Sequence, residues 1–262
     1  MHTYIWMNSL AGLLVGAMVG ATGVGGGAVM TPLLILLMGV APHTAVGTDL
    51  IYASLTKMVG VGVHHSEQRV DWQVVRRLAS GSLPTAIATL LWLRWAKSGG
   101  VHEGVIIVAL GVVLVITAVT MVLKPYLYKV GKNLRIGEPT QFKHLQPPLT
   151  VLAGVILGFL VALTSIGAGA LGSVMLLFLY PLRLTPAKLV ATDLAHAIPL
   201  ALVAGAGHIL LGNVDFVLLG WLLLGSVPGV LIGAHFGGKL PDRVLQIAIA
   251  LVLGSVGLKL LN

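Results

Sequence analysis

The sequence predicts an all-α polytopic membrane protein made of two internally repeated halves. Hydrophobic residues make up 57% of the 262-residue chain and charged residues only 9%, whereas a soluble domain carries roughly 25% charged residues. The second half repeats residues of the first in the same order, and each half interrupts an apolar segment with a cluster of glycines. Such paired, glycine-broken segments are typical of secondary transporters. Since a water-soluble core cannot enclose this much apolar surface, we expect lipid to surround the protein.

The repeat keeps its order through one small gap. Residues match at an offset of 142 before a two-residue insertion and at an offset of 144 after it. The matched residues are Thr22 and Thr164, Gly25 and Gly167, Gly27 and Gly169, Pro42 and Pro186, Thr48-Asp49-Leu50 and Thr192-Asp193-Leu194, His64 and His208, Val70-Asp71 and Val214-Asp215, and Gly81-Ser82 and Gly225-Ser226. A chance similarity would not preserve this order, so we interpret the chain as two copies of one unit.

Apolar segments divide the chain into a first repeat, residues 1–123, and a second repeat, residues 149–262. About 20 apolar residues are needed to span a bilayer as a helix. The expected segments are 5–39 (broken at 23–27), 44–64, 73–95 and 103–123 in the first repeat, and 149–180 (broken at 167–169), 187–211, 216–236 and 243–261 in the second. Residues 124–148 are polar and basic, and we predict that they form a cytoplasmic linker.

Positive charges in the loops favour one of two topologies. If each broken segment is a single span, the halves run parallel and the loop Lys and Arg residues divide nine against six. If each is a re-entrant hairpin beside three spanning helices, the halves are inverted and the division becomes twelve against three. The positive-inside rule prefers the larger asymmetry. The sequence therefore favours inverted repeats, with the linker in the cytoplasm and both termini outside.

The glycine breaks are the first candidate site. Non-helical backbone at membrane depth survives only where it is buried in protein or lines a polar cavity, and a helix that begins after a break aims free N–H groups at it. Helices beginning at Ala28 and Ala170 would therefore offer two anion-binding ends, although close helix packing by small residues is the alternative. The predicted substrate-binding residues of the breaks are Thr22, Gly25, Gly26, Gly27, Thr164, Gly167 and Gly169.

Among the charged residues inside predicted spans, three are candidates for function. Asp49 and Asp193 occupy matching positions, and intramembrane carboxylates indicate a functional site by default. They could carry a coupling proton, bind a cation, cap the neighbouring break, or serve only as structural helix caps near the interface. Lys57 lies mid-span, eight residues beyond Asp49, and its repeat counterpart is Ala201. We expect Lys57 to bind an anionic substrate; a structural ion pair or snorkelling to the interface is the alternative.

Other chemistries find little support in the sequence. The chain contains no cysteine, which excludes thiolate nucleophiles and thiolate metal sites. His64 and His65 lack a second ligand cluster, and Asp49 and Asp193 lack the glycine-flanked motif of an intramembrane aspartyl protease. The basic residues lie between apolar segments, where orientation signals belong. We therefore expect no enzyme activity, no cofactor, no metal site and no nucleic-acid partner.

The glycine-broken first segment ending in Pro32, the repeated Thr-Asp-Leu triplet and the two four-segment halves together resemble the TauE/SafE family, the sulfite exporters of bacterial and archaeal membranes. The most specific piece is ATGVGGGAVMTPLL, residues 21–34. The resemblance implies a secondary transporter that exports small anions, sulfite or organosulfonates, across the inner membrane of a prokaryote. The second repeat departs from the pattern, with Ala168 in place of a glycine and Val174 in place of Pro32.

The alternative function is a passive anion channel or a permease for another small organic anion. An exporter of an anion from a negative-inside cell could run as a uniporter, because the membrane potential supplies about 2.3 kcal/mol per charge per 100 mV. Import would need H+ or Na+ as coupling ion, with Asp49 or Asp193 as its site. The sequence leaves the substrate, the direction, the coupling ion and the oligomeric state, a homodimer included, open.

Overall fold

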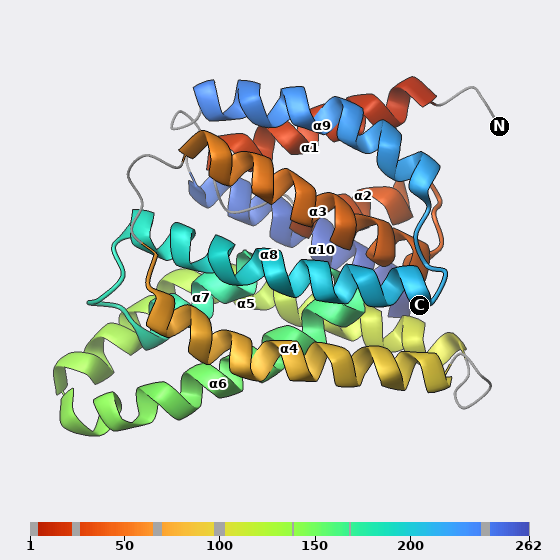
Figure 1. Cartoon of the computed structure of the whole chain (residues 1–262). Helices are drawn as coiled ribbons and strands as arrows, with labels where there is room; N and C mark the ends of the chain where they lie inside the picture. Colours follow the sequence, from red (N-terminus) through yellow and green to blue (C-terminus); the bar gives the residue numbers. More distant parts are fainter. Residues whose placement is uncertain are drawn as a thin grey trace.

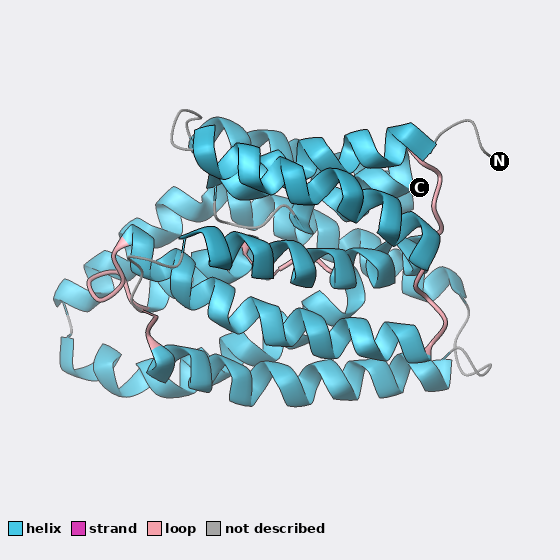
Figure 2. Ribbon diagram, turned by 45° about the horizontal axis from the view of Figure 1, so that its top comes forward, coloured by secondary structure: helices cyan, strands magenta, loops and turns pink. Residues whose placement is uncertain are grey.

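The described part of the chain is helical apart from short connections (Figures 1 and 2). A computed structural model describes residues 5–22, 27–64, 70–96, 103–137, 139–167, 169–236 and 242–261. Its helices are α1 (Ile5–Thr22), α2 (Gly27–Leu36), α3 (Pro42–His64), α4 (Trp72–Trp95), α5 (Glu103–Gly137), α6 (Pro139–Thr164), α7 (Ala170–Leu179), α8 (Pro186–Leu210), α9 (Phe216–Phe236) and α10 (Asp242–Leu261).

Each predicted apolar segment coincides with one helix or, where a break was predicted, with two. The breaks separate α1 from α2 and α6 from α7. The linker predicted over residues 124–148 is itself largely helical, because α5 continues to Gly137 and α6 begins at Pro139. Its Lys, Arg, Leu and Gln residues are good helix formers, so a polar composition does not end the helices there.

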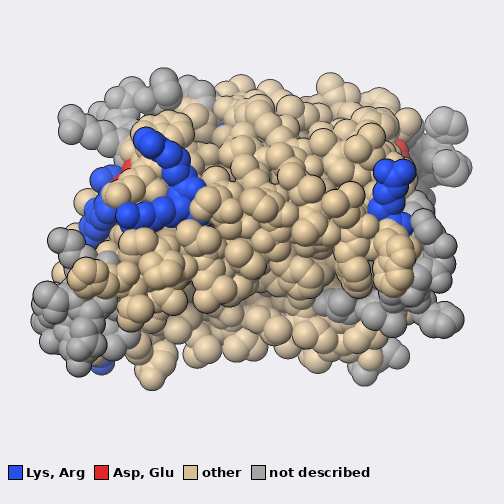
Figure 3. Space-filling model, turned by 60° about the horizontal axis from the view of Figure 1, so that its bottom comes forward, with Lys and Arg blue, Asp and Glu red and all other residues tan. Residues whose placement is uncertain are grey.

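The surface has the apolar character of a membrane protein. Figure 3 shows one face on which Lys and Arg gather near the two ends and leave a broad band between them without either. Within the described residues, three helical stretches are long and apolar enough to cross a bilayer: His144–Thr164, Ala187–Leu210 and Phe216–His235. Shorter apolar stretches cover Trp6–Gly20, Leu110–Leu123 and Ala250–Leu261. Together with the low charge of the chain, these stretches show a polytopic membrane protein.

Glycines allow helices of the two halves to pack closely in pairs. A Cβ atom on these glycines would meet the backbone of the neighbouring helix, so only glycine permits this separation. The facing residues are Gly12 with Leu222 and Gly16 with Ser226 for α1 and α9, and Gly154 with Leu78 and Gly158 with Ser82 for α6 and α4. Residue numbers rise together along each pair, so both pairs are parallel.

Contacts between the halves are reciprocal. Two kinds of contact occur twice. Helix α10 packs against α2 and, in the same way, α5 packs against α7; helix α3 packs against α9 and, in the same way, α8 packs against α4. Helices α3 and α8 also contact each other. Helix α1 begins and α10 ends at one end of the molecule, whereas α5 ends and α6 begins at the other (Figure 1). The helices of each half therefore pack mainly against helices of the other half, and α3 and α8 lie at the contact between the two halves.

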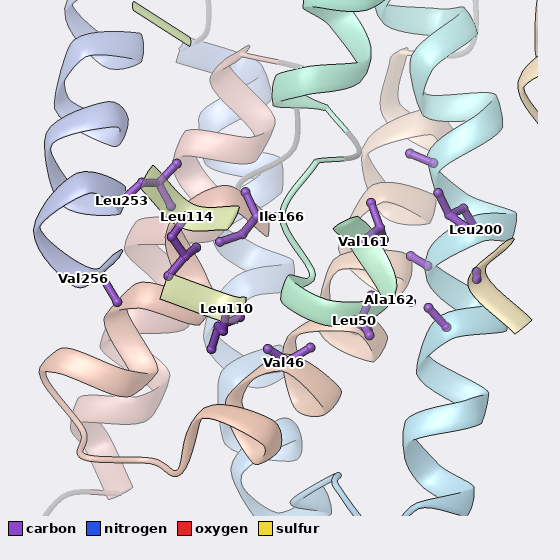
Figure 4. Packing of buried hydrophobic residues seen from close by; sticks show 14 of the residues in the cluster. Val46, Leu50, Leu110, Leu114, Val161, Ala162, Ile166, Leu200, Leu253 and Val256 are labelled. Carbon is purple, nitrogen blue, oxygen red and sulfur yellow. The ribbon is translucent and has the colours of Figure 1, made fainter. Parts of the chain in front are cut away.

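The largest hydrophobic cluster surrounds the break between α6 and α7. Ile166, within the break, lies beside Leu114 of α5 and near Leu253 of α10, while Leu50 and Leu200 come from α3 and α8 (Figure 4). All five side chains are fully buried. The break thus runs through the packed interior and is shielded from lipid, as non-helical backbone at membrane depth must be.

The α1–α9 contact generates a test of the packing. A Cβ at Gly225 would collide with the carbonyl group of Ser9 on α1, whereas a Cβ at Gly220 of the same helix meets no atom within 4 Å. We expect Gly225→Ala to destabilise the purified protein by roughly 1–3 kcal/mol, the usual cost of overpacking, and to lower its thermal unfolding midpoint. Gly220→Ala is the matched control, and equal midpoints for the two variants would contradict this packing.

Candidate functional site

The break between α6 and α7 has its own hydrogen-bonded structure. Ser165, Gly167 and Gly169 have positive φ angles of 60°, 141° and 110°, a region that glycine adopts readily and other residues rarely. Thr164 Oγ1 lies 2.7 Å from the Leu160 carbonyl oxygen, to which it donates, and accepts a hydrogen bond of 3.1 Å from the Ile166 amide. The hydroxyl of Thr164 therefore serves to hold the break.

Helix α7 begins at Ala170, as predicted, with an open first turn. Gly169 caps the helix without a side-chain hydrogen bond, and the Gly172 amide donates to the Gly167 carbonyl oxygen at 2.9 Å. The break thus leads into a helix N-terminus in the interior, where its partial positive charge favours an anionic group.

Asp49 and Asp193 both lie in the interior, each beside the helix that follows a break. Asp49 is fully buried, and its Oδ2 accepts a hydrogen bond of 2.5 Å from Thr31 Oγ1 of α2. Asp193 is 3% exposed, and its carboxylate lies against Gly172 of α7, where a Cβ atom on the glycine would be 3.4 Å from Asp193 Cγ. The carboxylates that match in sequence therefore occupy corresponding places against α2 and α7.

Lys57 is buried within electrostatic range of both aspartates. It is 3% exposed and interacts electrostatically with Asp193 of α8 and, more weakly, with Asp49 of its own helix. From the sequence, Asp49 is the only predicted ion-pair partner of Lys57, because Asp49 and Lys57 lie on the same face of one predicted helix. The stronger partner comes from the packing of α3 against α8, which residue spacing does not reveal.

A buried serine–histidine pair adjoins Lys57, and sequence reasoning missed it. Ser82 Oγ of α4 lies 2.7 Å from His196 Nε2 of α8, and the His196 ring lies within electrostatic range of Lys57. The available signal was spacing, because His196 follows Asp193 by three residues and so shares its helix face. The repeat counterparts of His196 and Ser82 are Tyr52 and Ser226, which lie beside each other.

The surroundings of Asp49 differ from those of Asp193. Ser165, in the break after α6, lies beside the Asp49 carboxyl group. Asp49 Oδ1 and Ser165 Oγ are both buried, and neither has a hydrogen-bond partner in the described part of the chain. Tyr52 takes the place of His196, and the uncharged Ala201 is the counterpart of Lys57. The two half-sites thus share a skeleton but differ in charge.

The threonines of the repeated Thr-Asp-Leu triplets have a structural role that the sequence did not indicate. Thr192 Oγ1 accepts a hydrogen bond of 3.0 Å from the Asp71 amide at the start of α4, and Thr48 Oγ1 accepts one of the same length from the Asp215 amide before α9. Each triplet therefore places its aspartate inside while its threonine fixes the entry of a helix of the other repeat.

An ion-pair network holds the start of α4 to the connection between α7 and α8. Arg183 donates two hydrogen bonds to Asp71, from Nε to Oδ2 at 2.7 Å and from Nη2 to Oδ1 at 2.8 Å. Lys188 Nζ lies 3.4 Å from Asp71 Oδ2. Burial alone would raise the pKa of Asp71, but the hydrogen bond and charge of Arg183 outweigh it and hold that pKa below its ordinary value.

The first break can be compared with prediction only at its edges. Thr22 ends α1 and Gly27 begins α2, one residue before the predicted start. Gly25 and Gly26 lie outside the described residues. The roles of Thr22, Gly25, Gly26 and Gly27 in substrate binding stay predictions, as do those of Lys57, Thr164, Gly167 and Gly169.

Apolar helices around a buried charged cluster, with helices that break in the interior, define a multi-pass membrane transporter. A family model described as "Sulfite exporter TauE/SafE" matches residues 9–260. The chain therefore belongs to the TauE/SafE family, which confirms the resemblance seen in the sequence. It is a membrane transporter and not an enzyme.

Curated bacterial proteins support this membership. The chain is 42% identical over 254 residues to "Probable membrane transporter protein YjnA" of Bacillus subtilis (strain 168), covering 96% of this chain and 98% of the relative. It is 27% identical over 256 residues to YdhB of the same organism, also named a probable membrane transporter protein, covering 95% and 96%. No significant match is found among solved structures.

The Asp71–Arg183 pair generates a pH-dependent prediction. Because the pKa of Asp71 is lowered by folding, the pair contributes stability above the ordinary aspartate pKa of about 3.9 and loses it as the pH falls through the folded-state pKa. We expect Asp71→Asn to lower stability at pH 7 by up to about 1 kcal/mol, since Arg183 is partly exposed. Thermal unfolding of variant and wild type at pH 7 and pH 3 measures this.

The control for Asp71→Asn is Arg76→Ala, which removes an exposed charge from the first turns of the same helix. We expect it to leave the pH profile unchanged. A stability difference between Asp71→Asn and wild type that is as large at pH 3 as at pH 7 would show that the ion pair is not its source.

Proposed function

We propose that the protein is a secondary transporter of small anions, sulfite or organosulfonates, which it exports across the inner membrane of a prokaryote. The observation that carries this proposal is Lys57, a buried lysine that interacts electrostatically with two buried aspartates, chiefly Asp193. A charged lysine inside a membrane protein is costly unless it faces a partner or a polar path. Family membership supports anion transport, because the matching model is described as a sulfite exporter.

Lys57 suits a carrier because its partner can be exchanged. Without substrate, Asp193 compensates its charge. An incoming oxyanion would compete with Asp193 for the ammonium group and would also meet the first turn of α7, which has no side-chain cap. The glycines of both breaks, Gly25, Gly26, Gly27, Gly167 and Gly169, would let the backbone approach the anion, and Thr22 would add a hydroxyl group.

The proposed architecture is a pair of inverted repeats, residues 1–123 and 149–262, each with a re-entrant hairpin and three spanning helices. Reciprocal helix packing supports it, as does the start of α1 and of α6 at opposite ends of the molecule (Figure 1). The linker 124–148 is then cytoplasmic and both termini are periplasmic, in agreement with the distribution of Lys and Arg.

Coupling and oligomeric state complete the proposal. The membrane potential alone can drive export of an anion. A coupling ion, H+ or Na+, would bind at Asp49 or Asp193, and import would require one. The packed cluster around Ile166 favours a carrier over a passive channel, which needs a continuous water path. Saturation and counterflow in proteoliposomes would identify a carrier; linear, unsaturated flux would identify a channel.

The first experiment is thermal stabilisation of the purified protein by sulfite, sulfate, thiosulfate, sulfoacetate, taurine, phosphate and simple carboxylates. A ligand that binds only the folded state at 100 times its Kd stabilises it by about 2.7 kcal/mol. We expect a sulfur oxyanion to raise the unfolding midpoint of wild type, and Lys57→Ala to remove most of this shift while the protein still folds.

The matched control for Lys57→Ala is Lys129→Ala, which removes an exposed ammonium group of α5 and should retain the full shift. An unchanged shift in well-folded Lys57→Ala would exclude Lys57 as an anion ligand. The absence of a shift with every anion in folded wild type would overturn anion binding and direct attention to cationic or neutral substrates.

A further inference from the structure

We infer that Asp49 carries the coupling proton of this transporter, bound on Oδ1 and hydrogen-bonded to Ser165 Oγ, while Lys57 and Asp193 hold the anion. The inference rests on the proposed function, because a proton can be a coupling ion only if its movement accompanies the transport of a substrate. It divides the two aspartates, which occupy matching positions in sequence, between two different tasks.

The first observation is a pair of buried oxygen atoms without partners. Asp49 is fully buried and Ser165 is 5% exposed. Thr31 satisfies Asp49 Oδ2, but Asp49 Oδ1 and Ser165 Oγ have no hydrogen-bond partner among the described residues, although the two side chains are neighbours. A proton on Oδ1 supplies a donor for Ser165, and the same hydroxyl can donate to the carboxylate when the proton leaves.

The second observation is the scarcity of counter-charge around Asp49. Helices α1 and α2 contain no charged residue, and His235 is the titratable residue of α9. On α3 itself, Tyr52 and Lys57 interact with Asp49, but Lys57 lies eight residues away, about 12 Å along the helix axis, and interacts more strongly with Asp193.

Among the described residues of helix α8, the charged and titratable side chains have other partners than Asp49. Its charged and titratable residues are Lys188, Asp193, His196 and His208. Lys188 is part of the Asp71 network, His196 pairs with Ser82, and His208 Nε2 lies 2.8 Å from the carbonyl oxygen of Ala162. An ionised Asp49 would therefore be a buried charge without a close counter-ion, which is costly, and a bound proton removes that cost.

The other half-site provides an internal comparison. Asp193 interacts electrostatically with Lys57, so its negative charge is compensated. In the surroundings of Asp49, the sequence counterpart of Lys57 is Ala201 of α8, and that of His196 is Tyr52 of α3. Equivalent carboxyl groups thus face different electrostatic environments, which favours a charged Asp193 and a neutral Asp49.

The break between α6 and α7 connects the two tasks. Its Ser165 reaches Asp49, and the helix that follows it, α7, lies against Asp193 through Gly172. A movement of this segment when an anion binds near α7 would displace Ser165 from Asp49 and change the affinity of Asp49 for its proton.

The test detects the proton without any substrate. Infrared difference spectra of the wild-type protein in lipid, recorded between neutral and alkaline pH, should contain the C=O band of a neutral carboxylic acid. The chain has only 8 Asp and Glu residues, so the band can be assigned by substitution. We expect Asp49→Asn to remove it and Asp193→Asn, the matched control, to retain it. Ser165→Ala should shift the band to higher frequency because the acid loses its hydrogen-bond acceptor.

A second measurement links the proton to transport. Sulfoacetate, which does not titrate near neutral pH, is applied as a gradient to proteoliposomes that enclose a pH-sensitive dye. We expect wild type to produce a sulfoacetate-dependent pH change that is reduced at least tenfold in Asp49→Asn. A purely structural aspartate would lower anion flux and proton flux together, whereas the coupling group separates them, so radiolabelled sulfoacetate flux is measured in parallel.

Several outcomes would overturn the inference. It fails if folded wild type shows no neutral carboxyl band at pH 7, if the band survives in Asp49→Asn, or if anion flux follows a Na+ gradient and not a pH gradient. If no anion is transported although the Asp49 band is present, the proposed function and the coupling fail together, while the protonated state of Asp49 stands.

Discussion

Inside a bilayer, every backbone N–H and C=O group must find its partner within the protein, and the interrupted helices make this requirement acute. The break between α6 and α7 meets it with Thr164, which binds the backbone of the break, and with the bond from Gly172 to Gly167. Ile166 anchors the segment in the main hydrophobic cluster. The close helix pairs α1–α9 and α4–α6 then enclose the centre, so the glycines of those interfaces support the site from a distance.

The two halves of the chain make matching backbone contacts around their aspartates but differ in the side chains beside them. Thr48 and Thr192 make equivalent hydrogen bonds to the backbone at the start of α9 and of α4. Replacing either threonine would remove the hydrogen bond that fixes the start of a helix. The side chains around the carboxylates do not have this structural role, and there the halves differ: Ala201 is the counterpart of Lys57, and Tyr52 is the counterpart of His196. A transporter gains from this combination because a symmetric scaffold can alternate between two arrangements while an asymmetric site binds one substrate.

Much of the scaffold could be predicted from sequence, because apolar segments and glycine clusters are local features. The breaks, the helix starting at Ala170 and the interior position of Lys57 follow from them. The main partner of Lys57 could not be predicted, nor could the Ser82–His196 pair, because both depend on how α3, α4 and α8 cross. The helical linker was missed for a different reason: polarity indicates where a span ends, but good helix formers continue the helix beyond it.

The charge of the central cluster limits how the site can work. Two carboxylates and one ammonium group would carry a net negative charge and repel an anion, whereas a neutral Asp49 leaves Lys57 and Asp193 balanced. Binding of an anion to Lys57, as proposed, would place negative charge near Asp193. In the proposed mechanism, the affinity of the site for an anion and the protonation of Asp49 would be linked by electrostatics, since each changes the charge that the other meets.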